Sequence, residues 1–172
     1  MGAISVVRKV DYEAARLLPA YFALVMATGI VSIAAYLYQL TIFAHFLFYF
    51  NILAFASLWA LTAVRITRHT PQFTTDLRDL YRGSGFFTLI AGTNTLGSEF
   101  VVIAHNYTIV YYIWIAGLVL WFVFQYALFS IFTVEENKPP IEKGLSGTWL
   151  VAIVSTQSVA VLGSQLSSTC AT

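Results

Sequence analysis

Residues 42–64 read IFAHFLFYFNILAFASLWALTAV and contain no aspartate, glutamate, lysine or arginine. A helix needs about 20 mostly apolar residues to cross the roughly 30 Å hydrocarbon core of a bilayer. Because lipid offers the backbone no hydrogen-bond partner, a segment of this kind must be helical. This stretch therefore predicts a transmembrane helix, and it decides the class of the protein.

Four further segments have a similar length and character, at residues 18–40, 85–104, 109–132 and 148–166. Together with residues 42–64 they predict an all-α membrane protein with five transmembrane helices. We expect a transmembrane domain over residues 18–166, between an N-terminal segment at 1–17 and a polar tail at 167–172.

The composition of the whole chain supports this class. Of the 172 residues, 59% are hydrophobic and only 10% are charged, whereas soluble domains carry about 25% charged residues. This content excludes an ordinary soluble domain and a disordered chain. The single cysteine excludes a disulfide-rich scaffold. A formal net charge of +1 predicts no attraction to nucleic acid.

The lysines and arginines lie outside the five segments, and always on the same side of the membrane. They precede the first segment, separate the second from the third and separate the fourth from the fifth: Arg8, Lys9, Arg16, Arg65, Arg68, Arg78, Arg82, Lys138 and Lys143. Cytoplasmic loops carry an excess of these residues. We therefore predict a cytoplasmic N-terminus and an outer C-terminus. Four of these residues lie at the cytoplasmic ends of the segments, where they either concentrate anions locally or only set the topology: Arg16, Arg65, Arg68 and Arg82.

The five segments fall into two alternating chemical classes. The second and fourth are rich in aromatic and aliphatic side chains, and the second contains no glycine. Such surfaces suit contact with lipid, and tryptophan and tyrosine near helix ends suit the headgroup region. The first, third and fifth segments instead contain many glycines, alanines, serines and threonines. These residues allow close helix packing, or hydrogen bonding across helices and to water.

Two of the odd-numbered segments carry their small residues on one helical face, at intervals of three and four residues. In the third segment this face holds Gly85, Thr88, Gly92, Thr95 and Glu99. In the fifth it holds Thr148, Ala152, Thr156, Ala160, Gly163 and Ser167. Such faces suit either a water-accessible pathway or tight helix–helix packing, and the pattern leaves both interpretations open.

Three stretches resemble a known family. PAYFALVMATGI at residues 19–30 resembles the opening helix of the tellurite-resistance/dicarboxylate transporter family, which includes the plant slow-type anion channels. FFT at 86–88 with AGTNTLG at 91–97 is similar to that family's third helix. GLSGTWL at 144–150 with VSTQS at 154–158 is similar to its fifth. The similarity runs in order across residues 18–166.

This resemblance implies a fold of ten helices, arranged as five hairpins around a pore that the odd-numbered helices line. It also implies trimers, and passage of small anions of the C4-dicarboxylate or malate, sulfite, chloride or nitrate class across a plasma or inner membrane. The five segments would be the first half of that ring. We accordingly expect the chain to be part of a longer protein, with the family's gating phenylalanine in the other half.

The pore-lining residues that we predict are neutral donors and small residues of the odd-numbered segments. Hydroxyl and amide groups coordinate an anion favourably but weakly, so that it can enter and leave. The predicted set is Thr28, Gly29, Ser32, Thr88, Gly92, Thr93, Asn94, Thr95, Thr156 and Gln157.

Glu99 is the one charged side chain inside the predicted segments. Intramembrane acids are costly and are functional by default, which favours a proton-coupling role. The alternative is that Glu99 lies near the outer end of its helix and reaches headgroup water. Asn51, in the second segment, is expected to make a hydrogen bond between helices.

A second functional class stays open, namely a non-transporting membrane subunit or receptor whose polar helix faces are packing surfaces. An enzyme is not expected, because the segments contain no Ser/His/Asp set and no His/Glu metal cluster. We therefore expect no catalytic residue, cofactor or metal site. The expected partners are small anions, lipid and further copies of the chain.

Overall fold

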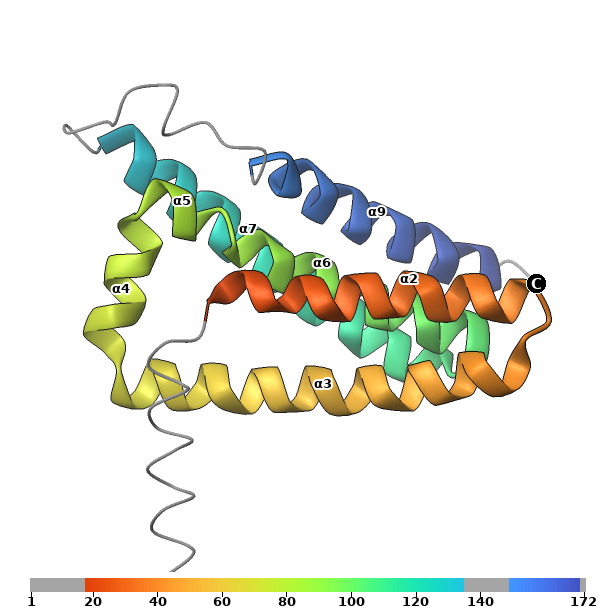
Figure 1. Ribbon diagram of the computed structural model, residues 1–172. Coiled ribbons are helices and arrows are strands. Elements are labelled where there is room, and N and C mark those ends of the chain that lie inside the picture. Colours follow the sequence, from red (N-terminus) through yellow and green to blue (C-terminus); the bar gives the residue numbers. More distant parts are fainter. Residues whose placement is uncertain (1–17, 135–148, 171–172) are drawn as a thin grey trace, which may run out of the picture.

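The computed structural model describes residues 18–134 and 149–170. Within these residues every regular element is a helix, which confirms the all-α class. Five of the helices are long and apolar enough to cross a membrane, as predicted. The start of the first and the end of the last lie at opposite ends of the bundle (Figure 1), as an odd number of spans requires.

The first hairpin consists of a short 3-10 turn η1 (Pro19–Phe22), α2 (Ala23–Leu37) and α3 (Thr41–Arg68). Pro19 lies in the first turn, where a backbone N–H has no partner within the helix, so the N–H that proline lacks is not needed. Gln39 takes a left-handed conformation, with φ of 66°, at the connection between the two helices. The Leu40 N–H then bonds back to the Ala35 carbonyl at 2.9 Å, so the chain reverses within three residues.

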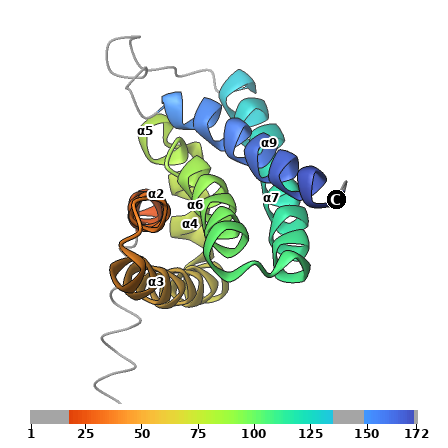
Figure 2. The same ribbon diagram turned by 90° about the vertical axis from the view of Figure 1, so that its right-hand side faces the viewer.

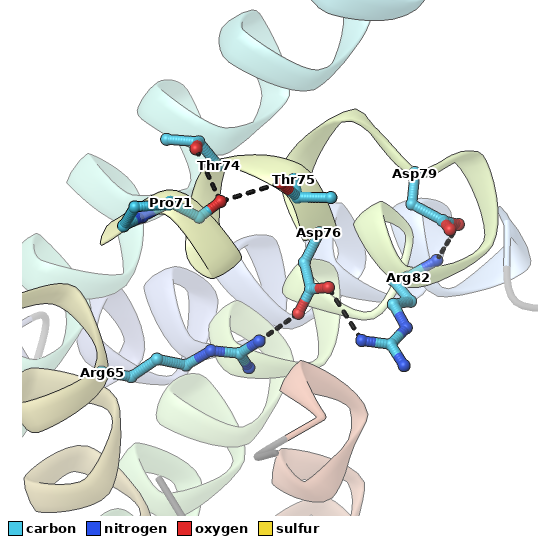
Figure 3. A network of polar contacts seen from close by, with 7 residues as sticks. All are labelled: Arg65, Pro71, Thr74, Thr75, Asp76, Asp79 and Arg82. Atoms are coloured by element: carbon cyan, nitrogen blue, oxygen red, sulfur yellow. Dashed lines mark hydrogen bonds and ion pairs between the residues drawn. The ribbon is translucent and has the colours of Figure 1, made fainter. Parts of the chain in front are cut away.

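Two short helices, α4 (Thr70–Arg78) and α5 (Leu80–Gly83), connect the first hairpin to the third span. Figure 1 shows α4 turned across the long axis of α3 at one end of the bundle. An ion cluster fixes this arrangement, because the Asp76 carboxylate of α4 accepts hydrogen bonds from Arg65 of α3 and Arg82 of α5 (Figure 3).

The third span is the centre of the molecule. It consists of α6 (Phe86–Glu99) and a π-helical turn η2 (Phe100–Ala104). Every residue of α6 except Thr95 is buried. Figure 2 shows α6 between the α2–α3 hairpin on one side and α7 (Tyr107–Val134) with α9 (Leu150–Cys170) on the other.

Aromatic packing holds the end of α6 nearest α5. Phe86, Phe87 and Ile90 of α6 form a buried cluster with Leu128 of α7. The ring of Phe86 stacks on Phe124, with ring centroids 5.2 Å apart. Residues of α7 and α9 both pack against this cluster, so it secures α6 against these two helices.

Candidate functional site

A groove of about 300 Å³ runs along the three odd-numbered spans. Its lining comes from α2, α6 and α9 and includes no residue of α3 or α7. The lining residues are Met26, Ile30, Ile33, Ala91, Asn94, Thr95, Ser98, Val154, Gln157, Ser158, Val161 and Gln165. The polar members are all uncharged amides and hydroxyls, so the groove offers hydrogen-bonding groups without a fixed charge.

Asn94 connects two walls of this groove. Its side-chain amide donates to the Ile90 carbonyl on α6 at 3.0 Å and to the Ser158 hydroxyl on α9 at 3.3 Å. Gly117 of α7 makes room for it, because a Cβ there would lie 2.4 Å from the Asn94 Oδ1 atom. The Asn94 side chain is thereby held in one position between three helices.

The glycine and hydroxyl face of α6 packs against the first span. The Thr88 hydroxyl donates to the Pro19 carbonyl at 2.9 Å. A Cβ on Gly92 would lie 3.1 Å from the Phe22 carbonyl oxygen, and one on Gly85 would lie 3.1 Å from the Ala20 nitrogen. Of the two interpretations of this face, helix packing is therefore the one that the structure shows here.

The corresponding face of α9 packs against α7. The Trp121 indole N–H donates to the Thr156 hydroxyl at 2.9 Å, and the Trp114 indole N–H donates to the Val159 carbonyl at 3.1 Å. A Cβ on Gly163 would lie 3.0 Å from the Trp114 Nε1 atom. The small residues of α9 thus accommodate two large indole rings. Thr148, the first member of the predicted face, lies outside the described residues.

Glu99 lies away from water, at the junction of α2, α3 and α6. The side chain is fully buried, so the alternative that it reaches headgroup water is wrong. The buried side-chain amide of Asn51 donates to Glu99 Oε2 and to the Val25 carbonyl. Asn51 therefore makes the interhelix hydrogen bonds that were predicted for it.

The residues that the sequence predicted as pore-lining do not share one surface. Asn94, Thr95 and Gln157 line the groove. Gly29, Ser32, Thr88 and Gly92 lie in helix–helix contacts. Thr156 contacts α7, and Thr93 faces a separate apolar cavity of about 760 Å³ between α3 and α7. Thr28 is partly buried on α2.

Sequence reasoning did not assign three polar residues of the groove: Ser98, Ser158 and Gln165. For Ser98, the spacing of residues on α6 could have indicated this position. Ala91, Asn94, Thr95 and Ser98 recur at intervals of three and four residues, so they share one helical face. The face predicted from the glycines is the neighbouring one, and it shares Thr95 with the groove.

Arg65 of α3 and Arg82 of α5 have a structural role that the sequence did not show. The side chains of Arg65 and Asp76 are only 3% and 6% exposed, so Arg65 is not at an open mouth where it could gather anions. Arg82 is 48% exposed and lies 2.9 Å from Asp76. The hydrogen bond and charge of Asp76 raise the pKa of Arg82 above its ordinary value. Arg16 lies outside the described residues.

The chain has a clear family relationship. A family model described as voltage-dependent anion channel matches residues 16–172. This match covers most of the chain and confirms the resemblance that the odd-numbered spans indicated. No curated protein and no solved structure gives a match.

Proposed function

Because the chain belongs to the voltage-dependent anion channel family, an integral membrane family that transports anions, we propose that small anions pass along the groove between α2, α6 and α9. The candidate substrates are chloride, nitrate, sulfite and C4-dicarboxylates such as malate. The observation that carries this proposal is the groove itself, which is lined only by odd-numbered spans and holds neutral donors.

The lining suits transient binding of an anion. Asn94, Thr95 and Ser158 line the groove, but their donor hydrogens bond within the protein. The Gln157 amide and the Ser98 hydroxyl line it together with aliphatic side chains and remain as donors for an anion. Neutral donors of this kind lower the cost of removing water from an anion without binding it as tightly as a buried arginine would. Selectivity would then depend on groove width and on the number of donors.

We propose that the groove forms one wall of a complete pore. In the family that the chain resembles, ten helices enclose the pore and subunits form trimers, whereas the five spans here supply α2, α6 and α9. We also propose a plasma or inner membrane location with the N-terminus in the cytoplasm. That topology can be tested with a cysteine introduced within residues 1–17 of a Cys170→Ser variant. In sealed vesicles of known orientation, an impermeant thiol reagent should reach it only from the cytoplasmic side.

Glu99 is the proposed point of proton coupling. It is not among the lining residues of the groove, but it lies one helical turn beyond Thr95 on α6. Coupling through Glu99 would therefore change the packing of α2, α3 and α6 and would not involve direct contact between the proton and the anion.

Two serines on α9 provide a matched test of the pathway. Ser158 lines the groove, whereas Ser155, one turn earlier, is fully buried. In a Cys170→Ser background, we expect a water-soluble thiol reagent to modify Ser158→Cys and to reduce anion flux into liposomes. Excess substrate anion should slow the reaction. Ser155→Cys should react far more slowly.

Equal protection at both positions would favour the second functional class, a non-transporting subunit with dry packing faces. Absence of anion flux in reconstituted wild-type protein of the full natural length would contradict the transport proposal directly. Competition among chloride, nitrate, sulfite and malate in the same liposomes would identify the substrate class.

A further inference from the structure

Glu99 and Asn51 form a buried polar pair with an unusual pattern of hydrogen bonds. Both side chains are fully buried. Asn51 Nδ2 donates to Glu99 Oε2 and to the Val25 carbonyl, the latter at 3.1 Å. Gly29 of α2 closes the site, because a Cβ there would lie 3.1 Å from Asn51 Nδ2 and 3.2 Å from Glu99 Oε2.

One oxygen of each side chain has no hydrogen-bond partner. These are Glu99 Oε1 and Asn51 Oδ1. The buried hydroxyl of Ser32 on α2 also lies near the Glu99 carboxyl, but it donates to the Ala44 carbonyl at 3.2 Å. If the carboxyl group is ionised, both oxygens can only accept hydrogen bonds, and neither can satisfy the other. A buried polar atom without a partner destabilises the folded protein. A proton on Glu99 Oε1 would convert this oxygen into a donor for the amide oxygen and remove both deficits.

No positive charge in the described part of the chain neutralises Glu99. The helices α2, α6, α7 and α9 contain no lysine, arginine or histidine. On α3, His45 is exposed and contacts the Thr41 carbonyl. Arg65 lies 14 residues beyond Asn51, about 21 Å along the helix axis, and pairs with Asp76.

His105, which follows η2, is exposed and lies six residues beyond Glu99, roughly 9 Å along a helix axis. An ionised carboxylate in this position would therefore be buried without an ion pair, which is strongly unfavourable.

We propose that Glu99 carries a proton in the folded protein and forms a ring of two hydrogen bonds with the side-chain amide of Asn51. In this ring the amide N–H donates to Glu99 Oε2, and the acid O–H donates to Asn51 Oδ1. The ring joins α6 to α3, beside the glycine that allows α2 to approach. It defines where a proton on Glu99 is held, and the ring itself does not depend on the anion pathway.

Infrared spectroscopy of the purified protein tests this proposal. The chain has eight acidic residues, and seven lie outside the predicted spans: Asp11, Glu13, Asp76, Asp79, Glu135, Glu136 and Glu142. The wild-type spectrum minus that of Glu99→Gln should contain one carboxylic-acid C=O band, which shifts to lower frequency in heavy water. Asp79→Asn, which changes an exposed acid, should leave this band in place.

Two results would overturn the proposal. The first is a Glu99→Gln difference spectrum at pH 7 that lacks the acid band and shows a lost carboxylate band instead. The second is an acid band whose frequency is unchanged in Asn51→Leu, because loss of the amide partner must weaken the hydrogen bonding of the acid. Asn51→Ser gives the same test if the leucine variant does not fold.

The infrared result is independent of transport. Glu99→Gln can form the same ring, with its amide N–H donating to Asn51 Oδ1, so it should fold as the wild type does. An acid band in a protein that passes no anion would contradict the transport proposal alone. Anion flux in a protein without the band would contradict the proton site alone.

Discussion

Replacing Asp76 by alanine tests the ion cluster that fastens α4 to the bundle. The Asp76 carboxylate lies between two guanidinium groups (Figure 3), one nearly inaccessible to water on Arg65 and one half-exposed on Arg82. The substitution leaves the Arg65 charge buried without its carboxylate. Removing one member of a buried ion pair costs about 3–5 kcal/mol.

The two arginines should contribute unequally. Arg82 is 48% exposed, and exposed pairs contribute only about 0–1 kcal/mol. We therefore expect Asp76→Ala to be the most destabilising substitution and Arg82→Ala the least. Arg65→Ala should fall between them, because Asp76 keeps Arg82 as a partner. Replacing both buried members with apolar residues, as in Arg65→Met with Asp76→Leu, should recover much of the loss, since the only charge that then lacks Asp76 is the half-exposed one of Arg82.

Thermal unfolding in mild detergent, followed by circular dichroism, measures these differences. At about 2–4 °C per kcal/mol for a chain of this size, Asp76→Ala should lower Tm by roughly 6–20 °C. Asp79→Asn is the matched control, because Asp79 is exposed and its side chain accepts a hydrogen bond from the Arg82 backbone. A Tm for Asp76→Ala equal to that of Asp79→Asn would refute this account of the cluster. A double variant less stable than Asp76→Ala would do the same.

Three further substitutions test helix contacts by the same unfolding measurement. Gly29→Ala places a Cβ 2.7 Å from the Thr95 methyl carbon and should cost about 1–3 kcal/mol through overpacking; an unchanged Tm would show that α2 can move aside. Thr88→Val removes the hydrogen bond from α6 to the η1 carbonyl and should cost about 1 kcal/mol; a loss that Thr88→Ser shares equally would point to packing instead. Trp114→Phe removes the hydrogen bond from the indole N–H to the Val159 carbonyl. It should cost about 1–3 kcal/mol of stability, because that carbonyl loses its side-chain donor. Wild-type stability would mean that water replaces this hydrogen bond.

The sequence predicted the class and the number of spans because these depend on local composition. Residues 42–64 contain no charged residue, and any such stretch must be helical in lipid wherever its neighbours lie. Asn51 was also predictable in kind, since a lone amide in an apolar helix must find a partner within the protein. Its partner, Glu99, was not predictable, because the two residues are 48 positions apart.

The orientation of each helix about its axis needed the tertiary structure. Gly92 and Asn94 are two residues apart on α6, yet the first contacts the Phe22 carbonyl oxygen and the second lines the groove. Glycine and hydroxyl faces suit close packing as well as water, so composition alone could not separate them. The approach of the η1 backbone to Gly92 decides the matter.

The sequence by itself determined that this chain lies in a membrane, where its five candidate spans are and which of them are polar. These properties follow from transfer free energies, which add residue by residue. Only the tertiary structure decided that Glu99 is sealed from water by Gly29 and Asn51, that Arg65 is paired inside the protein, and that the groove uses the Asn94 face of α6. Those outcomes depend on which helices approach one another and at what rotation, because a side chain's surroundings are supplied by residues distant in the chain.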